Sequence, residues 1–270
     1  MNLKNIKALL FDLDGTLVNQ GSYISDLTIE SLRSLKKKGY KLFINSGRPV
    51  FLTLKLLNKY DLLPLFTMIF GCNGIEVYDV SKNKLDKSAA LSSEVIKKIA
   101  NIYKDEPIAI TLLTENGLLI NKMITLEVIE FYKKTRGLDY HLINFDELDF
   151  NSSKVLGVVD RVVCLENNLK VDLLNSEEFD CFYSNRNLIE FVPKGFNKAK
   201  ACQYIKEHFG LSADEMLAFG DEENDIPMFE ECIGVAMGNA YKTVANYAKY
   251  TTSSVEELGI SSFLKENNVI

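Results

Sequence analysis

The stretch Ala8-Leu9-Leu10-Phe11-Asp12-Leu13-Asp14-Gly15-Thr16-Leu17 joins a short apolar run to two carboxylates and a glycine. An apolar run without polar alternation is typical of a strand that is covered on both faces, as in parallel sheets. Ligands of such sheets lie beyond the carboxyl ends of the strands, so we expect Asp12 and Asp14 to meet the ligand. Gly15 allows a sharp turn, and Thr16 offers a hydroxyl. Two carboxylates this close repel each other, which favours a divalent cation or a shifted pKa.

Length, composition and charge narrow the class of protein. With 270 residues, 47% of them hydrophobic, the chain can form one large or two modest domains with a well-buried core. The net charge of −6 argues against nucleic acid as the main partner, because phosphate-backbone binding needs concentrated Lys and Arg. No apolar run approaches the roughly 20 residues that span a bilayer, and the N-terminus does not lead into a signal-peptide core. We therefore expect no membrane partner and a cytoplasmic location.

The cysteines and histidines form no pattern that indicates a metal or a catalytic site. The five cysteines are odd in number and widely spaced, without a Cys-x-x-Cys pair, so buried free thiols are expected. His141 and His208 lie far apart and outside any motif. The sequence therefore argues against a zinc site and against histidine-based catalysis.

A second strand, expected at 40–45, ends in the turn Ser46-Gly47-Arg48-Pro49. Pro49 suits the first turn of the following helix, and Gly47 lets backbone amides approach a ligand closely. A strand, a Ser-Gly turn and a helix N-terminus together make an anion site. Alternatively, Ser46 is only the N-cap of that helix. The other elements expected in this part of the chain are helices at 24–39 and 49–60 and strands at 67–71 and 75–78.

A lysine near the start of a later helix needs an explanation. Asn197 is a good N-cap for a helix that runs to Phe209, and this places Lys198 in the first turn, where a positive charge opposes the helix dipole. A bound phosphate would explain the lysine. Lysine is also an abundant surface residue, and Lys194 and Lys200 are rivals for the same role.

A second acidic cluster follows another expected strand, at 215–220. Asp221 stands at the tip of that strand, and Asp225 follows four residues later, where a helix begins with Pro227 in its first turn. The alternative is an N-cap with a negatively charged first turn. The elements expected after this cluster are a strand at 233–237, a helix at 241–247, a short strand near 250 and a helix at 255–264.

The stretch between residues 79 and 183 differs from the rest of the chain in its sequence pattern and contains no acidic motif at a strand end. Helical patterns alternate with strand-like runs, and Glu115-Asn116-Gly117 is a hairpin turn between two of them. We predict an inserted α+β domain here, although 138–154 show no readable pattern. The expected helices lie at 92–104 and 125–136, and the expected strands lie at 108–114, 118–122, 155–165 and 181–183. A further strand, at 188–192, is expected after this domain.

Four motifs resemble, in the same order, those of the haloacid dehalogenase-like (HAD) phosphotransferase superfamily. They are Asp12-x-Asp14-Gly15-Thr16, Ser46-Gly47-Arg48, Asn197-Lys198-Ala199 and Gly220-Asp221-x-x-Asn224-Asp225. The insertion resembles the cap of the Cof-type, class IIB branch, in which a pair such as Asn73-Gly74 also occurs. Serine replaces the frequent threonine at 46, and asparagine replaces the usual serine at 197, but neither change removes a needed chemical group.

The resemblance implies an α/β fold: a Rossmann-like parallel-sheet HAD core with an inserted α+β cap domain (C2B type). The core would comprise 1–80 and 186–270, and the cap, which would select the substrate, would comprise 81–185. A cap that closes over the core would keep water from the leaving group. Candidate cap contacts, each of which is also an ordinary turn or surface residue, are Thr114, Glu115, Asn116, Arg186 and Asn187.

The resemblance also implies an Mg²⁺-dependent phosphatase that hydrolyses small phosphorylated metabolites, such as sugar phosphates, through an aspartyl-phosphate. Asp12 would be the nucleophile, and the Asp14 side chain would act as general acid and then as general base. Mg²⁺ suits a site with few carboxylates, substrate oxygens and water, and its protein ligands would be Asp12, the Asp14 backbone carbonyl and Asp221. The other implied roles are binding of phosphoryl oxygens by Ser46, the Gly47 amide, Lys198 and Asn224, and orientation of Lys198 or a metal-bound water by Asp225.

Two other functions stay open from the sequence. A phosphomutase of the same superfamily shares this site but returns the phosphoryl group to a sugar. A phosphate-ester-binding regulatory protein would use Asp12 only as a switch, or would bind the ester without hydrolysing it. The presence of Asp14, positioned as an acid and base, argues against such a switch.

Overall fold

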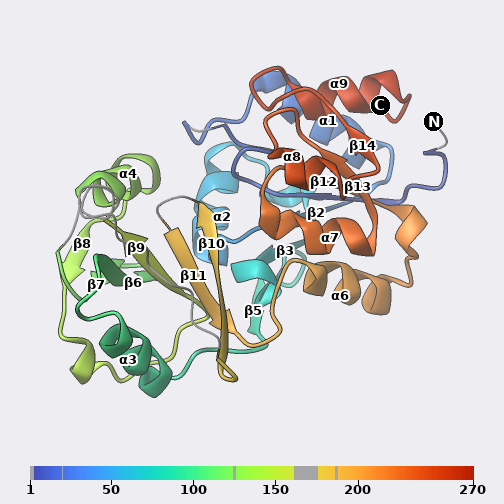
Figure 1. The fold of residues 1–270 in the computed structure, drawn as a ribbon. Coiled ribbons are helices and arrows are strands. Elements are labelled where there is room, and N and C mark those ends of the chain that lie inside the picture. Colours follow the sequence, from blue (N-terminus) through green and yellow to red (C-terminus); the bar gives the residue numbers. More distant parts are fainter. Residues whose placement is uncertain (1–2, 20, 124–125, 161–175, 186–187) are drawn as a thin grey trace. The chain divides into compact units, whose positions relative to one another are not determined.

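The computed structural model describes residues 3–19, 21–123, 126–160, 176–185 and 188–270 (Figure 1). The chain divides into two units. Residues 1–86 and 197–270 form one, called the core unit below, and Lys87–Phe196 form the other, called the inserted unit. In the described part of the chain, no helix has the length and apolar character that a bilayer-spanning segment needs.

The core unit contains an eight-stranded sheet with the strand order β14-β13-β12-β1-β2-β3-β4-β5. The strands from β14 to β3 in this order run parallel to one another, and β4 is antiparallel to β3. The strands are β1 (Ala8–Phe11), β2 (Lys41–Asn45), β3 (Met68–Gly71), β4 (Glu76–Asp79), β5 (Lys84–Lys87), β12 (Met216–Gly220), β13 (Ile233–Ala236) and β14 (Tyr250–Thr251).

Strand β1 lies between β2 and β12 and is fully buried, as its apolar run predicts. Successive side chains of a strand point to opposite faces of the sheet. Leu9 and Phe11 accordingly belong to the hydrophobic cluster on one face, and Ala8 and Leu10 to the cluster on the other. Phe11 also stacks on Phe219 of β12, with ring centroids 5.5 Å apart.

Helices cover both faces of the core sheet, which gives three layers (Figure 1). On one face lie α1 (Asp26–Lys37), α2 (Val50–Lys59) and α9 (Gly259–Glu266). On the other face lie α6 (Ala199–Phe209), α7 (Ile226–Glu231) and α8 (Lys242–Ala245). The expected α/β core with a parallel sheet is therefore observed.

Most helices and strands expected for the core unit begin and end within one or two residues of their predicted ranges. The exceptions are β5, which was not predicted, and the last helix, which was expected at 255–264 but begins at Gly259. Leu258 has a left-handed backbone (φ 62°), and the Gly259 amide donates to the Ser254 carbonyl at 2.9 Å, so a turn precedes the helix.

The inserted unit is an α+β structure whose six strands have the order β10-β11-β9-β6-β7-β8. Helix α3 packs on one face through Ile96 and Ile99, in a cluster with Ile110 and Phe191 of the sheet. The elements are α3 (Ser93–Ile102), β6 (Ile108–Thr114), β7 (Gly117–Ile120), α4 (Leu126–Arg136), β8 (Tyr140–Leu142), β9 (Val155–Val159), β10 (Phe179–Asn185) and β11 (Leu188–Pro193).

Two features of the inserted unit differ from the expectation or extend it. Strand β8 lies in the stretch 138–154 that shows no readable pattern; its three residues are all exposed, so no apolar alternation marks it. Strand β9 ends at Val159, and residues 161–165 of the strand expected there lie outside the described residues. The predicted β6–β7 hairpin is present, with Thr114 opposite Gly117.

The boundaries of the inserted unit lie later in the chain than the expected ones at 80/81 and 185/186. At the entry, β5 extends the core sheet. At the exit, β11 pairs antiparallel with both β9 and β10 and so remains in the inserted unit.

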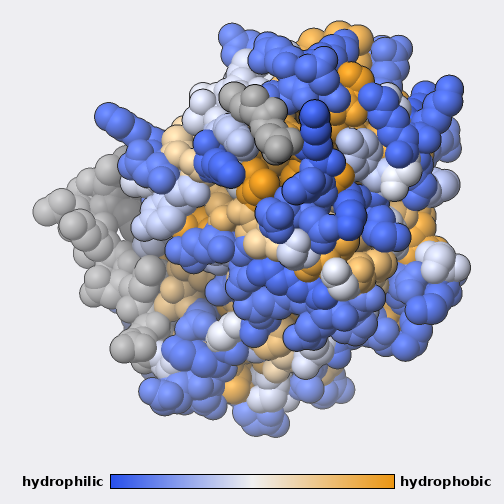
Figure 2. Space-filling view, turned by 90° about the vertical axis from the view of Figure 1, so that its right-hand side faces the viewer, coloured by the Kyte–Doolittle hydropathy of each residue, from blue (hydrophilic) through white to orange (hydrophobic). Residues whose placement is uncertain are grey.

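On the face seen in Figure 2, hydrophilic side chains cover most of the described surface, with hydrophobic ones scattered among them.

Candidate active site

The sequence motifs of the core unit meet at the carboxyl ends of three adjacent parallel strands. Phe11 of β1 is level with Phe219 of β12 and Ile44 of β2. The residues that follow these strands therefore emerge side by side, and the Asp12 amide donates to the Phe219 carbonyl at 3.0 Å. This is the edge of a parallel sheet at which ligands bind.

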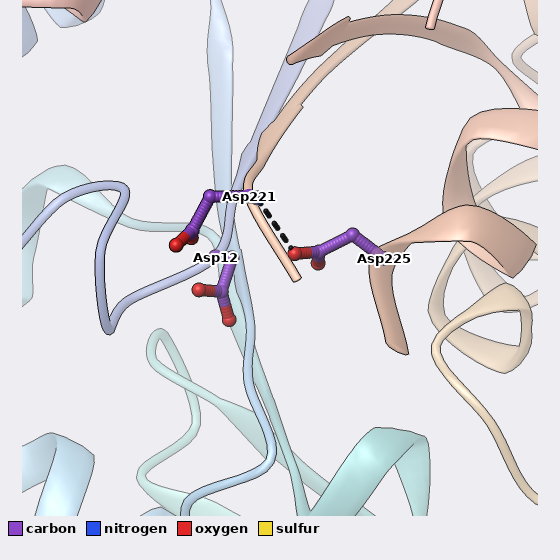
Figure 3. A group of neighbouring side chains, drawn as sticks. All are labelled: Asp12, Asp221 and Asp225. Atoms are coloured by element: carbon purple, nitrogen blue, oxygen red, sulfur yellow. Dashed lines mark hydrogen bonds between the residues drawn. The ribbon is translucent and has the colours of Figure 1, made fainter. Parts of the chain in front are cut away.

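Three buried carboxylates converge at this edge. One oxygen each of Asp12, Asp221 and Asp225 lies within 4.8 Å of the others. Figure 3 shows Asp12 and Asp221 beside each other, with Asp225 reaching toward them from the start of α7. Oδ2 of Asp225 accepts hydrogen bonds from the backbone amides of Asp221, at 3.0 Å, and Glu222, at 3.1 Å. These two bonds fix the turn that carries Asp221.

Lys198 is the counter-ion of this group. Its ammonium lies 2.6 Å from Oδ1 of Asp12 and 2.6 Å from Oδ1 of Asp225, and the side chain is 1% exposed. Asn45, at the end of β2, donates from Nδ2 to the Lys198 carbonyl at 2.9 Å and holds the backbone in place. With all groups ionised, three carboxylates and one ammonium leave two formal negative charges, which a divalent cation would balance.

The structure separates Lys198 from its two rivals. Lys194 lies in the inserted unit and pairs with Asp180 at 2.8 Å, and Lys200 is exposed. Helix α6 begins at Ala199, so Lys198 is the N-cap residue rather than a first-turn residue. Asn197, expected as the N-cap, instead accepts a hydrogen bond from the Ala199 amide at 2.9 Å.

Burial dominates the electrostatics of the site. It raises the pKa of Asp12 well above the usual range, because the opposing charge of Lys198 does not fully compensate and Asp225 and Asp221 add repulsion. Burial and then the charge of Asp225 raise the pKa of Asp221 to about 7. Burial alone would lower the pKa of Lys198, but the Asp12 and Asp225 carboxylates outweigh it and raise that pKa. Repulsion among the carboxylates contributes to the raised pKa values of Asp12 and Asp221, and a bound cation would relieve this repulsion.

Asp14 lies outside the buried group. Its carboxylate is 49% exposed and is held by the Arg48 guanidinium, with Nε 2.6 Å from Oδ2 and Nη2 bonded to Oδ1. Such a bidentate contact fixes the orientation of a carboxylate.

Gly15, the residue after Asp14, has a φ of +83°, and a Cβ there would lie 2.1 Å from Oδ2 of Asp221. Glycine at this position thus lets the first loop approach the second acidic motif closely.

The Ser46-Gly47 turn lies beside a helix end that the chain itself occupies. Oγ of Ser46 accepts a hydrogen bond from the Arg48 amide at 3.1 Å. Helix α2 begins at Val50, whose amide has no partner within the helix. This amide instead donates to Oε2 of the buried Glu76 at 2.8 Å. The group that accepts at this helix N-terminus is therefore the Glu76 side chain, and binding of a phosphate by the Ser46-Gly47 turn stays a prediction.

The other predicted site residues fall into two groups. Asn224 lies in the turn between Asp221 and Asp225, and its Oδ1, a hydrogen-bond acceptor, is buried without a partner among the described residues. Thr114 donates to the Gly117 carbonyl in the hairpin of the inserted unit at 2.8 Å. The other cap candidates in this hairpin are the exposed Glu115 and Asn116; the last two, Arg186 and Asn187, lie outside the described residues.

Sequence reasoning overlooked several residues that shape the site. Arg48 was quoted only as part of a motif, and Glu76, Asn45 and Asn239 were not considered. Asn239 follows β13 and donates from Nδ2 to Oδ2 of Asp221 at 3.1 Å. The rule that polar residues after parallel strands meet the ligand would have identified Asn239, because β13 was predicted correctly.

Comparison with known proteins agrees with the geometry. The profile of the haloacid dehalogenase-like hydrolase family matches residues 9–264. The chain belongs to this family. As a HAD-like hydrolase it resembles 5-amino-6-(5-phospho-D-ribitylamino)uracil phosphatase YitU of Bacillus subtilis, with 28% identity over 283 residues and 96% of each chain covered. It also resembles HMP-PP phosphatase of Yersinia pseudotuberculosis, with 28% identity over 232 residues, 85% of this chain and 83% of that one.

A solved structure shows the same fold. The structure of the HAD subclass IIB sugar phosphatase BT4131 superposes on this HAD-like hydrolase with a TM-score of 0.81 and 25% sequence identity. The match covers 98% of the present chain and 100% of BT4131. The identification as a Cof-type, class IIB-like HAD hydrolase and the α/β fold class are thus confirmed. The chain is a phosphoric monoester hydrolase of this family.

Proposed function

We propose that this HAD-like hydrolase is an Mg²⁺-dependent phosphatase of small phosphorylated metabolites that works through an aspartyl-phosphate on Asp12. The observation that carries the proposal is the buried group of Asp12, Asp221, Asp225 and Lys198 at the carboxyl edge of the core sheet. A phosphate ester is an anion attacked by another anion, so the site must neutralise charge and align the reactants. Clustered carboxylates with one buried lysine meet this need.

The oxygen donors fit Mg²⁺, which prefers a few carboxylates together with water and substrate oxygens. Both oxygens of Asp225 already bond within the protein, to Lys198 and to two backbone amides. The family motifs imply that Asp12, Asp221 and the Asp14 carbonyl would hold the ion, while Asp225 would stay bonded to Lys198 and to the two amides. When bound, the ion would offset the repulsion between the nucleophile and the phosphate.

Residues of the chain would divide the remaining work. Lys198 fixes the Asp12 carboxylate for attack on phosphorus, and Asp225 fixes Lys198. Asp14 would give a proton to the leaving oxygen and then take one from the water that hydrolyses the intermediate. Arg48 holds Asp14 in one orientation. The groups proposed to bind phosphoryl oxygens are Ser46, the Gly47 amide, Asn224 and Lys198.

Substrate choice is assigned to the inserted unit, acting as a cap. Two relatives are named for the phosphate esters that they hydrolyse, a phospho-ribitylamino-uracil and HMP-PP, and a third is named a sugar phosphatase. A small cytoplasmic phosphate ester is accordingly the proposed substrate class. Thr114, Glu115 and Asn116 of the β6–β7 hairpin remain proposed contacts.

The test is phosphate release from a panel of sugar phosphates, nucleotide-precursor phosphates and an aryl phosphate, with Mg²⁺ or with EDTA. Asp12→Asn should abolish release, and the surface variant Asp26→Asn should retain it. Mass spectrometry of acid-quenched wild type should detect a phosphorylated peptide that contains Asp12. Absence of release from every ester would overturn the proposal. Bisphosphate-dependent isomerisation without release would indicate a phosphomutase, and a long-lived phosphoprotein a regulatory switch.

A further inference from the structure

The carboxylate of Asp221 is held on both of its oxygens. Oγ1 of Thr16 donates to Oδ1 at 2.7 Å, and Nδ2 of Asn239 donates to Oδ2 at 3.1 Å. Thr16 belongs to the first motif, but Asn239 belongs to none of the four. The contact joins residues that come from the ends of the neighbouring parallel strands β12 and β13.

The amide of Asn239 has a fixed orientation. Its Oδ1 accepts a hydrogen bond from the Val255 amide at 2.9 Å, so the oxygen must face that N–H group. The NH₂ group therefore faces the site, where it donates both to Asp221 and to the Gly15 carbonyl, the latter at 2.9 Å. Its three partners, which are Val255, Asp221 and Gly15, come from three different loops and together fix one orientation of the Asn239 amide.

The same NH₂ group ties together the two loops that carry the proposed metal ligands. The Gly15 carbonyl belongs to the loop after β1, directly after Asp14, and Asp221 begins the loop after β12. These loops approach so closely that a Cβ on Gly15 would lie 2.1 Å from Oδ2 of Asp221. Asn239 bonds to both sides of this contact. As a neutral donor, it adds no charge and leaves the negative charge of the site available to a cation.

We propose that Asn239 is a positioning residue that presents the Asp221 carboxylate to the divalent cation and thereby sets the affinity for that cation. This inference rests on the proposed function, because it assumes that Asp221 is a metal ligand. Hydrogen bonds from such outer partners orient metal ligands, and their loss lowers metal affinity by about 10- to 100-fold. The expected effect is therefore on cation binding, with little effect on the chemical step once the ion is bound.

The test is calorimetric titration of metal-free full-length protein with MgCl₂, for wild type, Asn239→Ala and Asn239→Asp. Asn239→Ala removes the donor, and Asn239→Asp places an acceptor against two acceptors, the Gly15 carbonyl and Asp221. We expect the Mg²⁺ dissociation constant to rise about 10- to 100-fold for alanine and further for aspartate. Phosphate release at saturating Mg²⁺ should stay within about threefold of wild type for Asn239→Ala. Asn246→Ala and Asn246→Asp, at an exposed asparagine after α8, are the matched controls and should bind like wild type.

The outcomes separate this inference from the proposed function. If wild type binds Mg²⁺ and Asn239→Ala binds it within threefold as tightly, the positioning role is overturned and the metal site stands. A lower melting temperature in EDTA with unchanged Mg²⁺ affinity also overturns the role, because Asn239 then serves only to join loops. If wild type itself binds no Mg²⁺, the metal-dependent function fails and the role fails with it.

Discussion

Replacement of Lys198 by methionine removes the charge of the buried counter-ion and keeps most of the side-chain length. Asp12 and Asp225 each lose a partner at 2.6 Å, in a place where both carboxylates are buried. Removal of one partner of a buried ion pair costs about 3–5 kcal/mol, because an uncompensated charge remains. We expect metal-free Lys198→Met to lose a free energy of unfolding in this range at pH 8.

The loss should depend on pH in a defined direction. Burial already raises the pKa of Asp12 in the folded protein, and Lys198 opposes that rise, so its removal raises the pKa further. An acid with a raised folded-state pKa binds more protons in the folded than in the unfolded state, so stability falls as pH increases. The destabilisation of Lys198→Met should therefore be smaller at pH 5 than at pH 8.

The measurement is urea denaturation followed by far-UV circular dichroism, in EDTA at pH 5 and pH 8. Lys206→Met is the control, because Lys206 lies on the same helix and pairs with Glu231 while 31% exposed. This pair is half-buried and still in contact with water, and ion pairs near the surface contribute about 0.2–1 kcal/mol, so the control should lose about that much. A loss below about 1 kcal/mol for Lys198→Met at pH 8, or equal losses for the two variants, would refute the reasoning.

Three further perturbations test other parts of the site. Gly15→Ala should reduce Mg²⁺ affinity and phosphate release by more than about tenfold, since its Cβ would meet Asp221, and unchanged values in calorimetry and phosphate assays would contradict this. Gly39→Ala, at φ +90° with open space around it, is the control; it should cost about 1–2 kcal/mol of stability for the left-handed backbone and keep activity. Glu76→Gln should destabilise the core by about 0.5–2 kcal/mol in urea denaturation, because the carboxylate at the Val50 amide is lost, and an unchanged midpoint would contradict this. Mg²⁺ should bind more tightly at pH 8 than at pH 6, because protons compete with the cation for Asp221, whose pKa is about 7 without metal. Calorimetry in two buffers should also detect the release of protons when Mg²⁺ binds. Equal Mg²⁺ affinities at the two pH values would exclude this competition.

Local sequence patterns identified the strands and the acids at their ends. The apolar run 8–11 predicts a strand covered on both faces, and the position of Asp12 after it follows from the geometry of parallel sheets. Local sequence alone does not separate Lys198 from Lys194 and Lys200, and only the resemblance to the third family motif selected Lys198. Only the three-dimensional arrangement shows that one ammonium is buried between two carboxylates.

The contacts that sequence reasoning missed join distant parts of the chain. Asn239 and the Gly15 carbonyl are 224 positions apart, and Glu76 reaches the start of α2 from a strand that follows it. A polar side chain carries no periodic signal that would indicate such a partner. Strand β8 was missed for a related reason, because its side chains are all exposed and its pairing with β7 alone defines it.

The insertion between the two segments of the core unit affects how the protein is made. The central strand β1 receives its parallel neighbour β12 only after the whole of Lys87–Phe196 has been synthesised. Thr16 and Asp221, which share a hydrogen bond, lie 205 positions apart. The inserted unit is contiguous and can form its sheet while one edge of β1 is still unpaired and prone to association with other chains. A chain that ends before β12 therefore contains Asp12 but lacks Asp221 and Asp225, so the group of buried carboxylates forms only after β12 has been synthesised.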